Sequence, residues 1–167
     1  SDLPMQSTTT HAEGIKKVGE LIKDIKMAMF VTIGDDGRPR SRPMQTQDVE
    51  FDGSVWFFTD VNSDKVKEIA NNPQVNVAYA SGAQFVSLTG TANVVQDAAK
   101  VRELWNPLLK AWFDGEDDPR IRLVRVDAES AEYWDTPGGR VASFISLVAS
   151  AVTGKRDESG ENETVRL

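Results

Sequence analysis

The chain has 167 residues, of which 19 are basic and 26 acidic, giving a formal charge of −7 at pH 7. A chain of this length can build one domain with its own hydrophobic core, and its acidic balance disfavours a nucleic-acid or anionic-membrane partner. Cysteine is absent and His11 is the only histidine, which excludes disulfides, thiol catalysis and His-based triads, predicts no metal site, and leaves any chemistry to a cofactor.

The first third of the chain predicts a helix and a β-hairpin. Ile15, Val18 and Ile22 recur at helical spacing after a capping box formed by Thr10 and Glu13, so the apolar stripe of this helix is expected to pack on the core. The predicted elements are a helix over residues 11–26, a strand over 27–33, a glycine-bearing turn over 34–37 and a second strand over 38–49.

Three arginines stand on one face of that second strand. Arg38, Arg40 and Arg42 occupy alternate positions, so their side chains point the same way, and like charges so placed repel unless water or an anion faces them. Pro39 and Pro43 indicate an edge strand, a bulge or a barrel rim. These residues alone allow a solvated edge as readily as an anion-binding face.

A strand, a polar corner and a short helix follow in quick succession. Residues 55–59 have strand composition, and Ser63 stands where a helix over residues 64–70 begins. An N-cap hydroxyl, free helix N–H groups and the adjacent Lys65 are the chemistry of a phosphate seat. The alternative is that Ser63 is only a helix cap and Lys65 only a solvated charge.

The turn at residues 51–53 is predicted to bring the arginines and the phosphate seat together. It has the composition of a hairpin turn, so the strand over residues 55–59 is expected to return antiparallel beside the arginine-bearing strand. Arg42 would then lie within cross-strand reach of Thr59, and so near the phosphate seat. This convergence favours the anion-binding interpretation over a solvated edge.

The second half of the chain predicts further strands and two helices. Gly90 indicates a bend or bulge in its strand, and Asp97 can cap a helix that Pro107 would kink. Trp105 and Trp112 on the apolar face of that helix are expected in the core or an interface rather than at a ligand. The other predicted segments are strands over 75–80, 84–95 and 121–134, a solvated acidic loop without EF-hand spacing over 115–119, and a helix over 141–152.

About six hairpin-linked strands interrupted by one short helix predict a small antiparallel barrel with helices packed outside. No GxGxxG motif follows a strand, so a dinucleotide-binding βαβ fold is not expected. No apolar run is long enough to span a membrane, and we therefore expect a cytoplasmic protein. The expected organisation is a flexible arm over residues 1–9, one domain over 10–153 and a polar tail over 154–167, whose Val165 and Leu167 can dock.

Four segments of the chain together resemble a known family. They are GRPRSRPM, DGSVWFFTDVNSDKVKEIANNPQVNVAY, FVSLTGTANVV and AEYWD, and they resemble the flavin-binding split-barrel superfamily of pyridoxamine 5′-phosphate oxidase, in particular its bacterial general stress protein branch. The resemblance covers roughly residues 15–150. It implies a mainly β protein with peripheral helices, built as a six-stranded antiparallel split β-barrel, and a homodimer with FMN at its interface.

The resemblance also implies which residues hold the cofactor. Arg42 matches the arginine that contacts the flavin phosphate, and Ser63 and Lys65 match the phosphate-holding segment, with Asp64 where the oxidases usually carry an arginine. Trp134 matches the aromatic residue that borders the ring. The expected cofactor-binding residues are Arg42, Pro43, Met44, Gln45, Thr46, Gln47, Phe58, Thr59, Ser63, Lys65 and Trp134.

Residues 43–47 are expected to run along the ribityl chain and the ring edge, where Gln45 or Gln47 can hydrogen-bond the pyrimidine, since an amide offers donors and an acceptor. The substrate residues of the oxidases are largely missing. Their lysine falls on Gln47 and their histidine on Ala142, and only Arg140 stands at the place of a substrate arginine. We therefore expect no oxidation of pyridoxamine phosphate, with Arg140 as the one candidate substrate residue.

The expected function is that of an FMN-binding general stress protein and flavin-dependent oxidoreductase of unknown substrate, in which the flavin carries hydride or electrons. No residue stands out as an acid or base, so no catalytic residue is predicted. The alternative is a non-enzymatic protein that stores flavin or senses redox state. FAD, haem and the deazaflavin F420 are alternative cofactors. The phosphate seat favours FMN over cofactors that lack a terminal phosphate nearby, and the position of His11 in a Ser/Thr-rich leader argues against haem.

Overall fold

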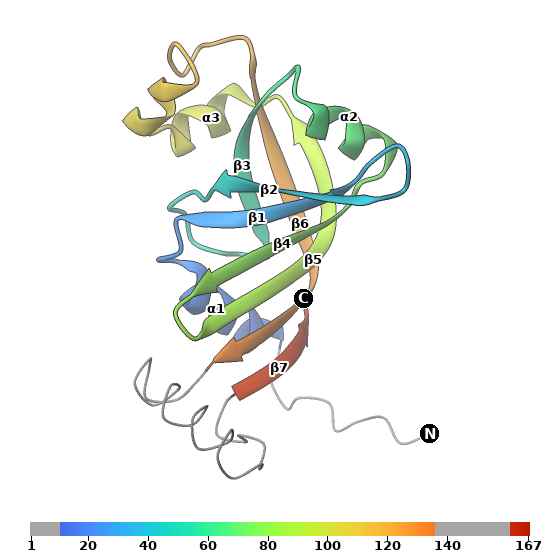
Figure 1. Ribbon diagram of the computed structural model, residues 1–167. Helices are drawn as coiled ribbons and strands as arrows, with labels where there is room; N and C mark the ends of the chain where they lie inside the picture. Colours follow the sequence, from blue (N-terminus) through green and yellow to red (C-terminus); the bar gives the residue numbers. More distant parts are fainter. Residues whose placement is uncertain (1–10, 136–160) are drawn as a thin grey trace.

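One antiparallel sheet of seven strands organises the computed structural model, which describes residues 11–135 and 161–167 (Figure 1). The strands follow the order β2-β1-β4-β5-β6-β3, and β7 pairs with β6 beside this path. The elements are α1 (His11–Ile22), β1 (Met27–Ile33), β2 (Pro39–Gln45), β3 (Ser54–Asp60), α2 (Asp64–Asn71), β4 (Gln74–Ser81), β5 (Gln84–Val95), α3 (Ala98–Leu104), the 3-10 helix η1 (Pro107–Ala111), β6 (Ile121–Asp135) and β7 (Glu161–Arg166). The predicted fold class, a mainly β split barrel with peripheral helices, is confirmed, and β7 adds a strand to the six expected.

The main core lies between the curved sheet and α1. Phe30 of β1 and Phe57 of β3 pack edge to face with ring centroids 5.3 Å apart, and both are almost completely buried. Val18 brings the apolar stripe of α1 into the same cluster, as predicted. A side chain at Gly14 would overlap Val165 of β7, so α1 and β7 approach each other as closely as a glycine allows.

The partner of β3 differs from the prediction. Residues 54–60 pair with residues 121–127 of β6 rather than with β2, which makes β2 and β3 the two edges of the main path through the sheet. The reason lies in residues 46–53, which are not a tight hairpin but a crossing loop that turns Phe51 into the core at 7% exposure. Burial of this aromatic side chain favours the crossing.

Two predicted helices end earlier than their apolar patterns. The helix predicted to reach residue 26 ends at Ile22, and Ile25 continues the buried stripe from the loop. The helix predicted to kink at Pro107 is instead broken there, because Asn106 caps the separate helix η1 through a hydrogen bond from the backbone N–H of Leu108. In both places, apolar residues continue at helical spacing beyond the end of the hydrogen-bonded helix.

The predicted turn chemistry at Gly37 and Gly90 is confirmed. Gly37 has a φ of 76° in the β1–β2 turn, a backbone conformation that glycine adopts without strain. At Gly90 the register between β5 and β6 shifts, and a side chain there would overlap the backbone of Asp127. The acidic loop over residues 115–119, in contrast, is not simply solvated, because the Asp118 carboxylate is 1% exposed and accepts hydrogen bonds from Arg120.

Within the segment predicted as a polar tail, residues 161–166 form the strand β7, which pairs with β6. Val165 is 4% exposed and Leu167 packs against the core, which confirms the predicted docking of these two side chains. The predicted helix over residues 141–152 lies outside the described residues, and the domain boundaries at residues 9 and 153 stay predictions. Across residues 11–135 and 161–167, no helix has the length and apolar character needed to cross a membrane.

Candidate functional site

A cavity of about 340 Å³ opens between the edge strands β2 and β3, the start of α2, and η1. Most of the predicted cofactor-binding residues line it: Pro43, Met44, Gln45, Gln47, Phe58, Thr59, Ser63 and Lys65. The predicted β2–β3 pairing was wrong, yet the two strands still converge here because the sheet curves until its edges approach each other (Figure 1). The cavity is therefore the gap in the split barrel.

Two hydroxyl groups meet at one end of this cavity. The Thr59 hydroxyl, from the end of β3, lies 3.0 Å from the Ser63 hydroxyl, at the N-cap of α2. Ser63 occupies the N-cap position, as predicted, but its side chain makes no capping hydrogen bond to the helix, which leaves the hydroxyl available to a ligand. The N-terminus of α2 adds the partial positive charge of its backbone dipoles. Hydroxyls and a helix N-terminus together suit an anion.

Lys65 is half-buried in the same cavity. Burial lowers the pKa of its amine, and Arg42 lowers it further, against the opposing carboxylates of Asp60, Asp64 and Glu68. A desolvated ammonium group is stabilised when an anion comes to lie beside it. This end of the cavity therefore favours an anionic ligand, and Lys65 is not merely a solvated charge.

Arg42 lies near the cavity but does not line it. Its guanidinium donates hydrogen bonds to the Thr32 hydroxyl at 2.7 Å and to the Glu68 carboxylate at 2.9 Å. Glu68 and Thr32 are both buried. The arginine charge is thus neutralised within the protein, and direct contact of Arg42 with a phosphate stays a prediction that requires the guanidinium to share or leave Glu68.

Glu68 is the residue that the sequence reasoning missed. It also lies 3.8 Å from the guanidinium of Arg40, which a carboxylate of Asp36 approaches at 3.6 Å. Arg40 and Arg42 of β2 therefore have carboxylate partners within the protein, although the Arg40 side chain is 56% exposed. The sequence did contain a hint of this role. Clustered arginines in an acidic chain are stabilised by a nearby carboxylate, and Glu68 lies one helical turn after Lys65.

The glutamine side of the cavity contains an unsatisfied acceptor. Oε1 of Gln47 is buried without a hydrogen-bond partner among the described residues, while its Nε2 donates to the Gln45 carbonyl at 3.4 Å. A buried acceptor of this kind is costly unless a ligand or water donates to it. Thr46, a predicted cofactor residue, does not line this cavity; its hydroxyl donates to the carbonyl of Ile25 at 2.5 Å.

Several lining residues were not predicted. Trp112 is 61% exposed and lines the cavity, so it is not in the core of its own chain, and its predicted place in an interface stays a prediction. Trp105 does pack on Phe58, with ring centroids 6.2 Å apart. Only the folding of η1 over β3 brings Trp112 to the site, and nothing in its local sequence shows this. The unpredicted lining residues are Met27, Asp60, Leu109, Trp112 and Phe113.

Trp134 lies away from this cavity on β6, opposite Phe85 of β5. Both side chains are exposed, at 39% and 44%, and Met29 of β1 is 42% exposed. Met27, which lines the cavity, is 52% exposed. Trp134 does not border its own chain's cavity, and Arg140, the candidate substrate residue, lies outside the described residues.

Residues 13–158 match the sequence profile of the family described as pyridoxamine 5′-phosphate oxidase like. General stress protein 26 of Bacillus subtilis is 28% identical over 120 residues, which cover 68% of this chain and 83% of that protein. Protein bli-3 of Neurospora crassa is 29% identical over 112 residues, which cover 60% of this chain and 54% of that protein. The match with bli-3 thus spans only about half the length of that relative.

Two solved structures are similar to this fold over most of its length. A candidate general stress protein 26 from Jannaschia sp. CCS1 has a TM-score of 0.75 at 25% identity, covering 93% of this chain and 99% of that one. The general stress FMN/FAD binding protein of Xanthomonas citri has a TM-score of 0.64 at 30% identity, covering 74% of this chain and 89% of that one. Since the family profile spans most of the residues, this chain belongs to the pyridoxamine 5′-phosphate oxidase-like family and is similar to general stress protein 26.

Proposed function

We propose that the chain binds FMN in the cavity between β2, β3 and α2 and acts as a flavin-dependent oxidoreductase of the general stress protein type. The observation that carries this proposal is the meeting of Thr59, Ser63 and Lys65 at one end of a mostly apolar cavity. The similarity to a protein of Xanthomonas citri described as FMN/FAD binding supports it.

The lining has the chemistry that a phosphorylated flavin needs along its length. Lys65 and the hydroxyls of Ser63 and Thr59 would hold the phosphate at the start of α2. At the other end, the side-chain amide of Gln45, which lines the cavity, would hydrogen-bond the pyrimidine edge of the ring. A bound flavin would supply the hydride or electron transfer, and the chain would hold it and exclude water from one side.

A seat for one phosphate group at one end of the cavity favours FMN over cofactors without a terminal phosphate there. FAD is the alternative cofactor. Its adenylate would have to extend out of the cavity past Lys65. Comparing the two dissociation constants distinguishes them: we expect FMN to bind more tightly, and a tighter FAD complex would contradict the assignment.

We further propose a homodimer that completes each flavin site. Phe85 and Trp134 present exposed apolar side chains on the neighbouring strands β5 and β6, and Met29 is exposed on β1 of the same sheet, beyond β4. Exposed apolar side chains grouped in this way commonly mark protein interfaces. Trp134 does not reach its own cavity, but a second copy packed on this face could bring its Trp134 to the flavin ring.

A non-enzymatic flavin-storage or redox-sensing protein is the second candidate. The observation in its favour is that Asp60 and Lys65 are the only titratable side chains among the described residues lining the cavity, and Lys65 is at the proposed phosphate end. No described group is placed to exchange a proton at the ring. An FMN-loaded protein that oxidises neither NADH nor NADPH would favour this candidate over the oxidoreductase.

The decisive experiment is a titration of the purified protein with FMN, followed by quenching of flavin fluorescence. We expect saturable binding and a roughly tenfold or larger loss of affinity in Lys65→Ala, because a charge-assisted contact with the phosphate is removed. Lys67→Ala is the matched control, since Lys67 is exposed on the same helix. Equal affinities of the two variants would place the phosphate elsewhere, and absence of binding would refute the proposal.

A further inference from the structure

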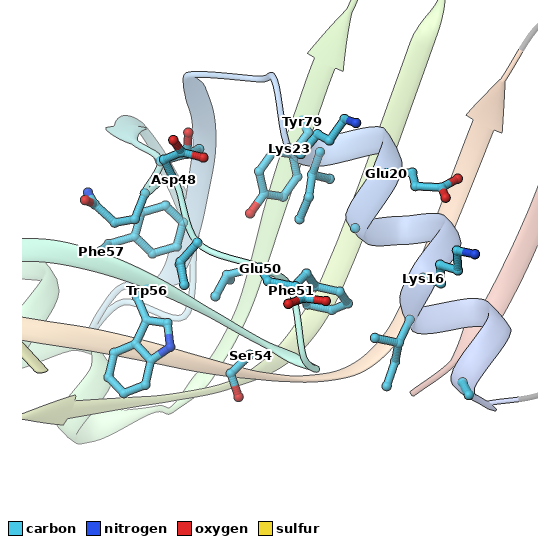
Figure 2. Close-up of a pocket in the computed structure, with 18 residues that line it drawn as sticks. Lys16, Glu20, Lys23, Asp48, Glu50, Phe51, Ser54, Trp56, Phe57 and Tyr79 are labelled. Atoms are coloured by element: carbon cyan, nitrogen blue, oxygen red, sulfur yellow. The ribbon is translucent and has the colours of Figure 1, made fainter. Parts of the chain in front are cut away.

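A second and larger cavity, of about 620 Å³, lies between α1, β3, β4 and the crossing loop over residues 46–53 (Figure 2). Its interior is mainly apolar and aromatic, with Phe51 and Phe57 among the lining residues. This volume falls in the range typical of small-molecule sites. The family resemblance assigns no cofactor residue to it except Thr46 and Gln47, which lie on its wall.

Two polar groups inside this cavity have no described partner. Tyr79 is 3% exposed, and its hydroxyl makes no hydrogen bond with the residues that the structure describes, although it lines the cavity. Figure 2 shows the Tyr79 ring between α1 and the loop that carries Asp48. Burial raises the pKa of Tyr79, so its hydroxyl remains a donor. Oε1 of Gln47, a buried acceptor without a described partner, also lies on the wall.

The charges around the cavity oppose one another. Lys16 and Glu20 lie on α1 and Lys23 lies in the turn directly after it, while the facing loop carries Asp48 and Glu50 (Figure 2). Neither sign dominates strongly, so the electrostatic potential gives little preference for a charged ligand. A ligand that pairs with both groups would carry one hydrogen-bond acceptor, for the Tyr79 hydroxyl, and one donor, for Oε1 of Gln47. The rest of that ligand would be apolar.

Gly19 keeps this space open from the helix side. It stands in the interior of α1, where glycine is less favourable than alanine, and it lines the cavity facing Phe51. A Cβ atom at this position would lie 3.4 Å from Cβ of Phe51. An alanine could be accommodated at that distance, whereas a longer side chain would enter the cavity or displace Phe51.

We propose that this second cavity is a ligand site for a neutral, flat aromatic molecule that offers a hydrogen-bond acceptor to the Tyr79 hydroxyl and a donor to Oε1 of Gln47. The site does not depend on FMN binding. Because Gln47 also lines the first cavity, a molecule bound here would lie next to whatever occupies that cavity. If the proposed function holds, the ligand is placed as a neighbour of the flavin.

The test uses 7-hydroxycoumarin as the probe, at a pH below the pKa of its hydroxyl, so that it is neutral and carries both a carbonyl and an O–H group. Binding to the full chain is measured by calorimetry, with and without saturating FMN. We expect one site per chain in both cases. Absence of binding would overturn the proposal, and so would competitive displacement by FMN, which would make the cavity part of the cofactor site.

Two pairs of variants place the probe in this cavity. Tyr79→Phe removes only the hydroxyl and should weaken probe binding about tenfold, whereas Tyr133→Phe, at a buried tyrosine that lines neither cavity, should leave it unchanged. Gly19→Leu should abolish probe binding while Gly19→Ala preserves it. All four should bind FMN within about twofold of the unmodified protein. Unaltered probe affinity in both Tyr79→Phe and Gly19→Leu would overturn the assignment.

Discussion

The carboxylate of Glu68 accepts a hydrogen bond from the guanidinium of Arg42 at 2.9 Å, and it lies on the same short helix as Lys65. The Thr32 hydroxyl donates to the same carboxylate oxygen at 3.1 Å. Glu68 therefore ties the end of β1 and the middle of β2 to α2 and limits the positive charge available at the cavity. An arginine that was expected to bind phosphate serves, in the structure, as the partner of a buried carboxylate.

Replacing Glu68 by glutamine is expected to destabilise the fold. Glu68→Gln keeps the shape but leaves the partly buried Arg42 without its counterion, which should lower the free energy of unfolding by about 1–3 kcal/mol. Urea denaturation measures this difference. Glu103→Gln is the control, because Glu103 is 60% exposed and pairs with Lys100 at the surface, where such pairs contribute about 0–1 kcal/mol. Equal losses of unfolding free energy in the two variants would show that the Arg42–Glu68 pair contributes no more to stability than a surface ion pair.

The affinity for FMN should depend on pH through Lys65. Its pKa is lowered below the ordinary lysine value of 10.5 by burial and by Arg42, and the phosphate binds the protonated amine better, so affinity should fall as the pH rises through that lowered pKa. Lys65→Arg stays charged and should remove the fall. Dissociation constants measured from about pH 7 to about pH 10 test this. If the affinity of the unmodified protein for FMN does not change with pH, Lys65 does not contact the phosphate.

The stability of the FMN-free protein should change with pH in the opposite direction. The unfolded chain holds the Lys65 proton more tightly than the folded chain, so stability should increase as the pH rises between the lowered pKa and 10.5. Urea midpoints of the unmodified protein and of Lys65→Met, which has no charge to bury, give the comparison. The difference between the two midpoints should shrink as the pH rises, and a constant difference would argue against a desolvated Lys65.

Mixed dimers can show whether Trp134 comes from the partner subunit. Neither Lys65→Ala nor Trp134→Ala alone should bind FMN well, but a dimer with one subunit of each type contains one site with both side chains intact. Random re-pairing of equal amounts should restore tight binding at about a quarter of the sites. Absence of restoration would place Trp134 in its own chain's site or outside any site, and sedimentation of each variant would confirm that dimers still form.

The close approach of α1 and β7 predicts a sensitive glycine. Gly14→Ala would place a methyl group into the side chain of Val165 and should lower the free energy of unfolding by about 1–3 kcal/mol. Gly115→Ala is the control, since nothing lies within 4 Å of the added atom there, and it should change stability by less than about 0.5 kcal/mol. Hydrogen exchange should also speed up in residues 161–166 of Gly14→Ala if β7 depends on this contact.

Much of the local structure could be predicted from the sequence. The turn at Gly37 and the bulge at Gly90 follow from the conformations that glycine permits, and alternation marks β1, β3 and β4 closely. The grouping of Thr59, Ser63 and Lys65 at one corner was also predictable, because the three lie within seven consecutive positions. A strand end followed by a helix start brings such residues together whatever the rest of the chain does.

Only the tertiary structure decided the contacts between distant segments. Alternation assigns a strand and its faces but does not name its partner, so β3 could not be assigned to β6 across the crossing loop. In the same way, the positive charge of Arg42 showed that a counterion was needed but not that Glu68, 26 residues away, would be that counterion. The second cavity depends on how α1, Tyr79 and the crossing loop pack. Short-range sterics and hydrogen bonding thus determined the helices and strands and the grouping of Thr59, Ser63 and Lys65, while burial of Phe51 and pairing of buried charge determined how the elements assemble.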